Sequence, residues 1–237
     1  MLPGTRTSME NYNGESCNGG ADQPLLEALE MSCNTAFAQL GVKLGEDRLR
    51  DTAKAFGIDT GGFDMPLPVV PSTLGDIAND AQLATSSIGQ QAVQLTPLQA
   101  AMIAGTVADQ GTEMKPYLVK SIQAPDLTTI DQTDPEELGK PITAGVADSL
   151  DQMMTAVVTG PRGTGKKAAI SGVHVAGKTG TAETSAGGKD NAWFVGYADK
   201  DGKKIAVAVF IQGGGQGGDK SAPLARSVMQ AYLSGGS

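Results

Sequence analysis

The chain has 237 residues, of which 40% are hydrophobic, and a formal net charge of −8. This length suits one large domain or two lobes. The acidic balance argues against a nucleic-acid partner, because phosphate contacts need clustered Lys and Arg. No apolar run approaches the roughly 20 residues that a membrane-spanning helix needs.

The first part of the chain is predicted to be helical after an irregular start. Residues 1–23 are rich in Gly, Asn, Ser and Thr, which is typical of an irregular surface segment. Apolar residues at helical spacing then predict helices over residues 24–31, 35–40 and 46–56. Ser32-Cys33-Asn34 interrupts the first two helices, and a helix cap is the simplest local explanation of that break. Residues 59–72 carry Pro and Gly and predict a long loop.

Two longer helices are predicted in the middle of the chain. Thr96 caps a helix over 98–109 with Pro97 at its first turn, and Thr143 caps a helix that runs to Val158. The inward face of the second helix is expected to hold Val146, Leu150, Met153, Met154 and Val157. Residues 78–94 are polar, 115–122 predict a short strand, and 124–139 predict an acidic, solvated loop.

The last part of the chain predicts a sheet with a covering helix. Three strands are expected over 173–183, 191–199 and 204–212, and Asp201-Gly202 is a strong hairpin signal. A helix over 222–233 is expected to pack on this sheet through Leu224, Val228 and Tyr232. The expected fold is therefore α+β, with a mainly helical part over 1–170 and an antiparallel three-stranded sheet plus C-terminal helix over 171–237.

The stretch from Gly160 to Lys167, Gly-Pro-Arg-Gly-Thr-Gly-Lys-Lys, differs by one residue from the phosphate-binding motif G-x-x-x-x-G-K-[ST]. Its last position is Lys167, so the hydroxyl that would hold Mg²⁺ is missing. A helix rather than a strand precedes it, and Pro161 removes one backbone N–H. We therefore interpret the stretch as a flexible glycine-rich loop and not as a nucleotide site.

Cys17 and Cys33 allow two interpretations, as buried small hydrophobic residues or as a disulfide in an oxidising compartment. Spacing alone does not decide, because a disulfide depends on the Cα separation in the fold. His174 is the single histidine, so no zinc-site spacing is present, and we expect neither a metal nor a cofactor. With no Cys or Asp partner nearby, His174 is predicted to be structural.

Residues 176–183, Ala-Gly-Lys-Thr-Gly-Thr-Ala-Glu, combine a cation, hydroxyls and glycine within a few positions. On a strand, the period of two places Thr179 and Thr181 on one face and Lys178 on the other. Gly180 leaves the backbone open to a second extended chain. Such an edge strand can bind a peptide by β-addition, with the hydroxyls and the ammonium group holding a carboxylate.

The ordered pair Ser32-x-Asn34 and Lys178-Thr179-Gly180 resembles the motifs of penicillin-binding proteins and serine β-lactamases. Further stretches are similar to the transpeptidase domain of class B penicillin-binding proteins, namely residues 96–100, 114–117, 177–183 and 192–196. Leu2-Pro3-Gly4-Thr5 and the cysteine pair are similar to the actinobacterial penicillin-binding protein A group. The resemblance covers nearly the whole chain and implies the fold shared by penicillin-binding proteins and serine β-lactamases.

One part of the family pattern is missing. The family's nucleophile lies in a Ser-x-x-Lys motif before the Ser-x-Asn, and no Ser in this chain has Lys three residues later. We therefore expect the chain to be the C-terminal portion of a transpeptidase domain. The nucleophile segment would lie in a separate polypeptide or be lost by truncation, and the chain alone would be unable to acylate.

The resemblance implies a role for each site residue in acyl transfer to a neighbouring stem peptide. Ser32 would relay a proton to the leaving nitrogen, and Asn34 would hold the substrate's amide carbonyl. Lys178 would set the field around Ser32 and the substrate carboxylate. The hydroxyls of Thr179 and Thr181 would bind that carboxylate beside Gly180, and the backbone N–H of Thr181 would form half of the oxyanion hole.

The resemblance also implies partners and a location. The ligands would be the D-Ala-D-Ala end of a peptidoglycan stem peptide and β-lactam antibiotics, and the missing N-terminal part of the same protein would be a further partner. The family works on the extracytoplasmic face of the bacterial cell membrane, held by an N-terminal anchor that this chain lacks. Disulfides persist there, so the resemblance favours a Cys17–Cys33 bridge.

Two other functions fit the same motifs. A D,D-carboxypeptidase or β-lactamase on this fold would use water in place of the acceptor amine, although the sequence offers no obvious general base for deacylation. The stretch Ala192-Trp193-Phe194-Val195-Gly196 favours the transpeptidase side. A binding or scaffold module that kept the cleft and lost the chemistry is the third possibility.

Overall fold

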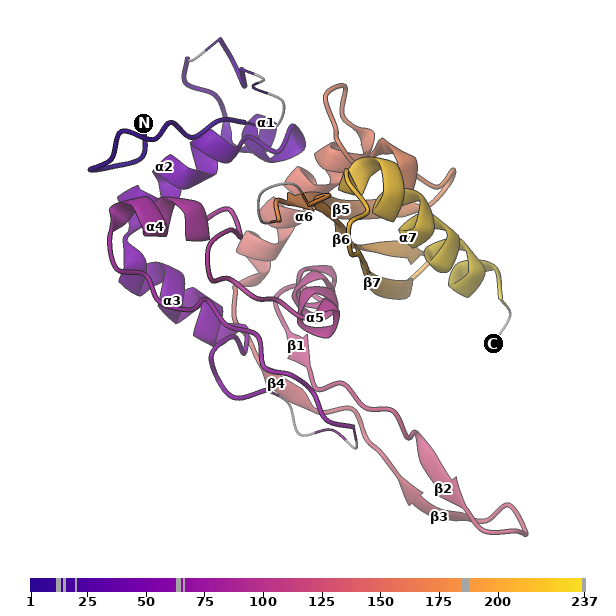
Figure 1. Ribbon diagram of the computed structural model, residues 1–237. Helices are drawn as coiled ribbons and strands as arrows, with labels where there is room; N and C mark the ends of the chain where they lie inside the picture. The colour runs from indigo at the N-terminus through magenta and orange to yellow at the C-terminus, as the bar shows by residue number, and fades with distance from the viewer. Residues whose placement is uncertain are drawn as a thin grey trace.

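The predicted sheet is the centre of the fold. In the computed structural model, which describes residues 1–11, 14, 16–19, 21–62, 65, 67–184 and 188–235, its strands are β5 (His174–Ala182), β6 (Asn191–Lys200) and β7 (Lys203–Ile211). They run antiparallel in the order β5-β6-β7 (Figure 1). Asp201 and Gly202 have positive φ angles of 55° and 83°, as a tight hairpin turn requires. The strands and the hairpin are therefore confirmed, while the connector 184–190 lies partly outside the described residues.

Helices cover both faces of the sheet. On one face, Phe194 and Ala198 of β6 pack in one cluster with residues of α7 (Gly217–Ser234) and of the end of α6 (Ala144–Thr159). On the other face, Tyr197 packs with residues of α6 and α5 (Pro97–Ala108). Because successive strand residues point to opposite faces of the sheet, β6 contributes core residues alternately to the two layers.

The face that α7 turns to the sheet differs from the prediction. Leu224, Val228 and Tyr232, which were expected to pack on the sheet, are 51%, 50% and 46% exposed. The buried face instead holds Ser221, Ala222, Ala225 and Met229. These mostly small side chains let the helix axis come close to the sheet, and the bulkier stripe then lies outside that contact. The helix also begins five residues before the predicted start at residue 222, at Gly217.

The helical part largely follows the predicted order. It contains α1 (Leu25–Glu30), α2 (Asn34–Leu44), α3 (Glu46–Ala55) and a short helix that was not predicted, α4 (Asp80–Ser86). The caps of the two longer helices are confirmed, since Thr96 Oγ1 accepts from the Gln99 N–H and Thr143 Oγ1 from the Val146 N–H. On α6, Met154 and Val157 are buried and Leu150 packs against the same core, as predicted, whereas Val146 is exposed and Ala147 is buried in the first turn instead.

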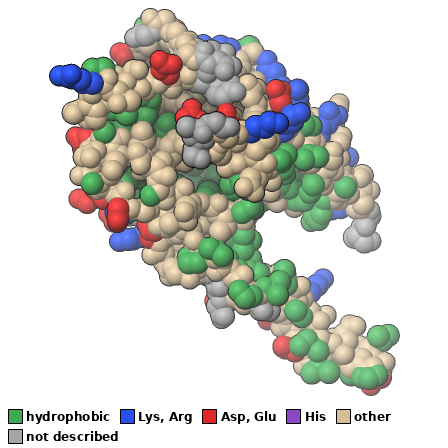
Figure 2. All heavy atoms as spheres, viewed as in Figure 1, with side chains coloured by type: hydrophobic (Ala, Val, Ile, Leu, Met, Phe, Trp, Pro, Cys, Tyr) green, Lys and Arg blue, Asp and Glu red, His purple; other side chains and the backbone are tan. Residues whose placement is uncertain are grey.

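Residues 113–139 form paired strands where a strand and a loop were expected. β1 (Glu113–Met114) pairs with β4 (Glu137–Gly139), and β2 (Ser121–Gln123) pairs with β3 (Thr129–Gln132), so the segment projects as a ribbon (Figure 1). Its chain reversal has Pro125-Asp126 followed by Leu127 with a φ of 67°, where glycine is the usual residue, so the hairpin signal is incomplete. Hydrophobic side chains are exposed along it, as Figure 2 shows. It was predicted to be a solvated loop because residues 124–139 are acidic and contain Pro.

Candidate active site

A tight turn between α1 and α2 presents Ser32. Ser32 has a φ of 60°, a left-handed conformation that is uncommon for a residue with a side chain. Its N–H donates to the Leu29 carbonyl, and the Cys33 N–H donates to the Ala28 carbonyl. These two bonds end α1, and α2 begins two residues after Ser32 at Asn34. The turn therefore holds the Ser32 hydroxyl at a fixed point between two helices.

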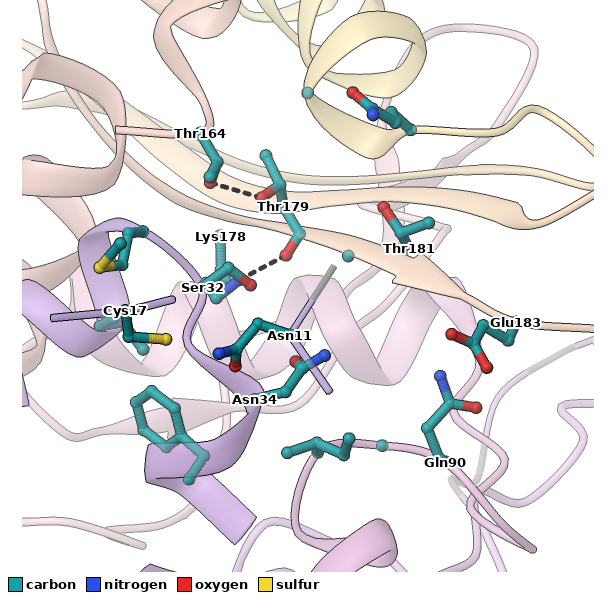
Figure 3. A pocket seen from close by; sticks show the side chains of 18 of the residues that line it. Asn11, Cys17, Ser32, Asn34, Gln90, Thr164, Lys178, Thr179, Thr181 and Glu183 are labelled. Carbon is teal, nitrogen blue, oxygen red and sulfur yellow. Dashed lines mark hydrogen bonds between the residues drawn. The ribbon is translucent and has the colours of Figure 1, made fainter. Parts of the chain in front are cut away.

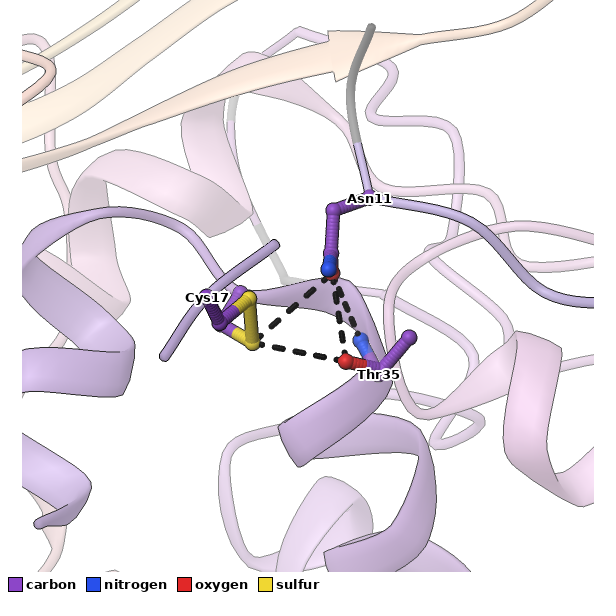
Figure 4. Close-up of a disulfide and its surroundings, with 4 residues drawn as sticks. Asn11, Cys17 and Thr35 are labelled. Atoms are coloured by element: carbon purple, nitrogen blue, oxygen red, sulfur yellow. Dashed lines mark hydrogen bonds between the residues drawn. A yellow bond between two sulfur atoms is a disulfide. The ribbon is translucent and has the colours of Figure 1, made fainter. Parts of the chain in front are cut away.

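The helix-cap explanation of Ser32 and Asn34 is not what the structure shows. The residue at the N-cap of α2 is Cys33, and it makes no side-chain cap. The capping acceptor comes from the N-terminal segment, where Asn11 Oδ1 accepts from the Thr35 N–H at 3.0 Å (Figure 4). Both Ser32 and Asn34 instead line a cavity.

Lys178 on β5 faces Ser32 across this cavity. Its Nζ donates to Ser32 Oγ at 2.6 Å and to the Thr179 carbonyl oxygen at 2.6 Å (Figure 3). The two side chains belong to residues 146 positions apart in the sequence. Burial lowers the pKa of Lys178 from its ordinary 10.5 to about 8, because a low-dielectric surrounding disfavours the charged amine.

The two threonines lie on the other face of β5, as the strand period predicts. Thr179 is 7% exposed, and its hydroxyl shares a hydrogen bond of 2.6 Å with the hydroxyl of Thr164. Thr181 lines the cavity two residues further along. In the sheet order β5-β6-β7, β5 is an edge strand of the described sheet, which leaves one side of it open for an added strand.

Gly180 has a second reason to be glycine besides the one predicted. A Cβ there would lie 3.0 Å from Cβ of Trp193 on β6. On α7, a Cβ at Gly217 would lie 2.4 Å from the Gly180 carbonyl oxygen. The bare backbone thus allows β6 and the start of α7 to close on the strand that carries Lys178.

All six predicted site residues line one cavity of about 570 Å³, namely Ser32, Asn34, Lys178, Thr179, Gly180 and Thr181. This size is typical of a pocket for a small ligand. Asn11, Gln90, Thr164 and Glu183 also line it, and Figure 3 shows Gln90 and Glu183 on the side away from Thr164. Glu183 was included in the 176–183 stretch but was not predicted to be a site residue. No local pattern marked Asn11 or Gln90, because both lie in irregular polar stretches.

The glycine-rich stretch before β5 supplies Thr164, which was not predicted as a site residue. It follows α6 and leads into a short 3₁₀-helix, η2 (Lys166–Ala168). Its N–H groups donate to the protein itself, to Glu30 Oε1 from Arg162, to the Glu30 carbonyl from Thr164 and to the Val157 carbonyl from Gly165. These donors are therefore already engaged and do not form an open cradle for a phosphate.

A disulfide joins Cys17 to Cys33, with Cα atoms 5.9 Å apart (Figure 4). This confirms the pairing that the resemblance implied. Cys33 directly follows Ser32, so the bridge ties the N-terminal segment to the turn that presents the hydroxyl. Cys17 also lines the cavity.

His174 has an acidic partner that the sequence did not indicate. Its Nε2 lies 2.7 Å from Oδ1 of Asp151 on α6, and the Tyr197 hydroxyl donates to the same oxygen. Burial, with the hydrogen bond to Asp151 adding to it, raises the pKa of Tyr197 well above its usual value. His174 does not line the cavity, and its contacts join α6 to the start of β5.

Comparison with known proteins identifies the family. Residues 2–230 match the family described as penicillin binding protein transpeptidase domain. Peptidoglycan D,D-transpeptidase PbpA of Mycolicibacterium smegmatis is 42% identical over 244 residues, which cover 100% of this chain and 49% of the relative. The protein of the same name from Mycobacterium tuberculosis is 41% identical over 99% of this chain and 49% of the relative.

Solved structures agree with this assignment. Penicillin-binding protein A of M. tuberculosis, as a ceftriaxone acyl-enzyme complex, superposes with a TM-score of 0.90 at 40% identity over 98% of this chain and 54% of that one. The D,D-transpeptidase domain of a peptidoglycan glycosyltransferase from Eggerthella lenta gives 0.83 at 30% identity, over 96% and 57%. The chain spans about half the length of the curated relatives it matches. It belongs to the penicillin-binding protein transpeptidase domain family.

Proposed function

We propose that this chain forms the Ser-x-Asn and Lys-Thr-Gly side of the active site of a peptidoglycan D,D-transpeptidase. The observation that carries the proposal is the 2.6 Å contact between Lys178 Nζ and Ser32 Oγ in a cavity that the hydroxyl-bearing strand β5 borders. The relatives named as D,D-transpeptidases support it, as does the acyl-enzyme form of the M. tuberculosis structure.

The proposed reaction is acyl transfer through a serine that a segment outside this chain supplies. The serine oxygen attacks the carbonyl of the D-Ala-D-Ala amide bond, and the C–N bond breaks. The leaving D-Ala nitrogen takes up a proton through Ser32. The acyl group then passes to the amine of a neighbouring stem peptide, the amine nitrogen loses a proton, and the serine hydroxyl is restored.

The residues of this chain bind and orient the substrate in this reaction. Asn34 holds the amide carbonyl of the substrate and the lysine of the Ser-x-x-Lys motif. Lys178 and the hydroxyls of Thr179 and Thr181 attract the terminal carboxylate. The Thr181 N–H donates to the developing oxyanion, a contact of the kind that is typically worth about 10²–10³ in rate.

A place outside the cytoplasm is part of the proposal. The Cys17–Cys33 disulfide supports it, because such bonds persist in oxidising compartments. Among the residues that the structure describes, no helix is long and apolar enough to cross a bilayer. We propose that the upstream part of the same protein supplies both the nucleophile and the attachment to the membrane.

A fluorescent penicillin tests the proposal. We expect it to label the chain when the chain is extended by the upstream segment of its own protein, with the adduct located by mass spectrometry on a Ser-x-x-Lys serine. The chain alone is expected to stay unlabelled. Covalent labelling of the chain alone would refute the placement of the nucleophile, and no labelling of either form would leave a binding module without chemistry.

The acceptor separates the two enzymatic alternatives. A transpeptidase passes the acyl group to an added amine and forms a cross-linked product, whereas a carboxypeptidase or β-lactamase passes it to water. We therefore expect the acyl-enzyme of the extended protein to be stable in plain buffer and to break down faster when a D-amino acid amine is added. Rapid release in plain buffer, unchanged by the amine, would favour hydrolysis.

A further inference from the structure

A carboxylate is buried at the end of α1, close to the site and outside the roles given above. Glu30 is 4% exposed, which is rare for a carboxylate, since burial of a charge is costly without hydrogen bonds. Its Oε1 accepts from the backbone N–H of Arg162 at 2.7 Å. The partner belongs to the glycine-rich loop, 132 residues further along the chain.

The loop meets Glu30 at more than one point. The Thr164 N–H donates to the Glu30 carbonyl, although at 3.4 Å this bond is long. A Cβ at Gly160 would lie 2.4 Å from Glu30 Oε1, so only glycine leaves room for the carboxylate there. Gly160 is therefore fitted to the buried Glu30 side chain, and Gly163 is crowded by the Val157 carbonyl at the end of α6, so packing explains both glycines without a nucleotide.

The same loop reaches the substrate strand at its other end. Thr164 lines the cavity, and its hydroxyl is 2.6 Å from the hydroxyl of Thr179. A Cβ at Gly218 on α7 would lie 2.3 Å from the Thr164 carbonyl oxygen, so the loop is also packed from that side. Figure 3 shows Thr164 and Thr179 pointing toward one another.

We propose that Glu30 is a positioning residue for the transpeptidase site, an inference that rests on the proposed function. α1 holds Ser32 at its end, two residues after Glu30, through the bonds from Ser32 to Leu29 and from Cys33 to Ala28. The Glu30 carboxylate fixes the loop that sets Thr164 against Thr179. One side chain therefore fixes the distance between the proton-relay hydroxyl and the carboxylate-binding hydroxyls.

The chain offers a matched set of variants. Glu30→Met keeps the volume and removes the acceptor, and Glu30→Gln keeps an amide oxygen that can accept from Arg162. Glu27→Ala is the control, because Glu27 joins the same helix to the same loop by an exposed ion pair of 2.5 Å with Arg162. Exposed pairs of this kind contribute little.

The readout is the second-order rate constant of acylation by a fluorescent penicillin, measured on the chain extended by its upstream segment. We expect Glu30→Met to lower it by about ten- to hundredfold, since a displacement of about 1 Å has that effect on positioned groups. Glu30→Gln and Glu27→Ala are expected to remain within about twofold of the original protein.

A double-variant cycle distinguishes positioning from a general loss of stability. Thr164→Val is expected to slow acylation to a similar degree, and Glu30→Met combined with Thr164→Val should add little to either change, because both act through the same hydroxyl contact. The proposal would be contradicted if the fold-losses in acylation rate of the two single variants multiplied in the double variant. It would also be contradicted if folded Glu30→Met acylated normally, or if Glu30→Gln lost as much rate as Glu30→Met.

Hydrogen exchange keeps the test separate from the proposed function. If the unaltered protein does not react with penicillin at all, the proposed function fails, and exchange at the amides of Arg162 and Thr164 decides the role of Glu30. Faster exchange in Glu30→Met together with unchanged exchange in Glu30→Gln supports the contact. Equal exchange in all three proteins overturns it.

Discussion

The start and the middle of strand β5 each carry a basic side chain, and the partners of the two differ in kind. At its start, His174 meets the carboxylate of Asp151, and Tyr197 shares that oxygen. Further along, Lys178 donates to a hydroxyl and to a carbonyl. Within the described residues, no ion pair satisfies the ammonium group.

This difference separates support from chemistry. A basic side chain that is already paired with a carboxylate has little left to offer a ligand. A partly buried ammonium group with neutral partners remains attractive to an incoming anion, at a cost that appears as its lowered pKa. The start of β5 therefore joins helix to sheet, and the later part of the strand is the one suited to a substrate carboxylate.

The largest expected effect is at Lys178. Lys178→Met should lower the acylation rate constant of the upstream-extended protein by about a thousandfold, because the electrostatic support of Ser32 and of the carboxylate is lost. Stability should be kept or raised, since a partly buried charge is removed. Lys204→Met is the control, because Lys204 also donates to a backbone carbonyl, that of Ala108 at the end of α5, but is exposed. Equal losses in both variants would contradict the comparison.

Removal of the disulfide comes next. Changing Cys17 and Cys33 to Ala together should lower the free energy of unfolding by about 3 kcal/mol, the value for closing a loop of this order of length, here with a sequence separation of 16. Urea titration with and without a reducing agent measures it. A reducing agent should destabilise the original protein and leave the double variant unchanged, and an effect on both would point to another cause.

Loss of the α6 carboxylate that contacts the start of β5 should affect stability alone. Asp151→Asn weakens the contacts of His174 and Tyr197, and we expect a loss of about 1–3 kcal/mol in the free energy of unfolding. Acylation should stay within about twofold, because neither partner lines the cavity. A large fall in acylation with unchanged stability would show that the start of β5 is coupled to the site around Lys178.

Local patterns predicted the sheet well for a clear physical reason. The alternation of residues and the Asp201-Gly202 turn are encoded within a few positions, so the strands end within one or two residues of the prediction. The prediction of the buried face of α7 was wrong because hydrophobicity alone favours Leu224 and Val228. Close packing on the sheet selected Ala222, Ala225 and Met229 instead.

The site shows where local reasoning ends. Strand periodicity alone places Thr179 and Thr181 on one face, but nothing local brings Ser32 to Lys178 across 146 positions. The family resemblance supplied that contact. Thr164 was missed because its loop was compared with a phosphate motif. Its partners are the Glu30 carbonyl, far away in the sequence, and the Thr179 hydroxyl, on β5.

A change of pH, with no residue replaced, should have effects of two opposite signs on stability and on acylation. Because the folded pKa of Lys178 is about 8 and its ordinary value is 10.5, the unfolded chain holds this proton between those values while the folded chain releases it. The contribution of Lys178 to stability therefore rises with pH across that window. Acylation needs the charged amine in our proposal, so it should fall as pH passes about 8, by about tenfold at pH 9. Lys178→Arg should remove both changes, because its guanidinium stays charged. A rate that rises through pH 8 would mean that the neutral amine is the active form.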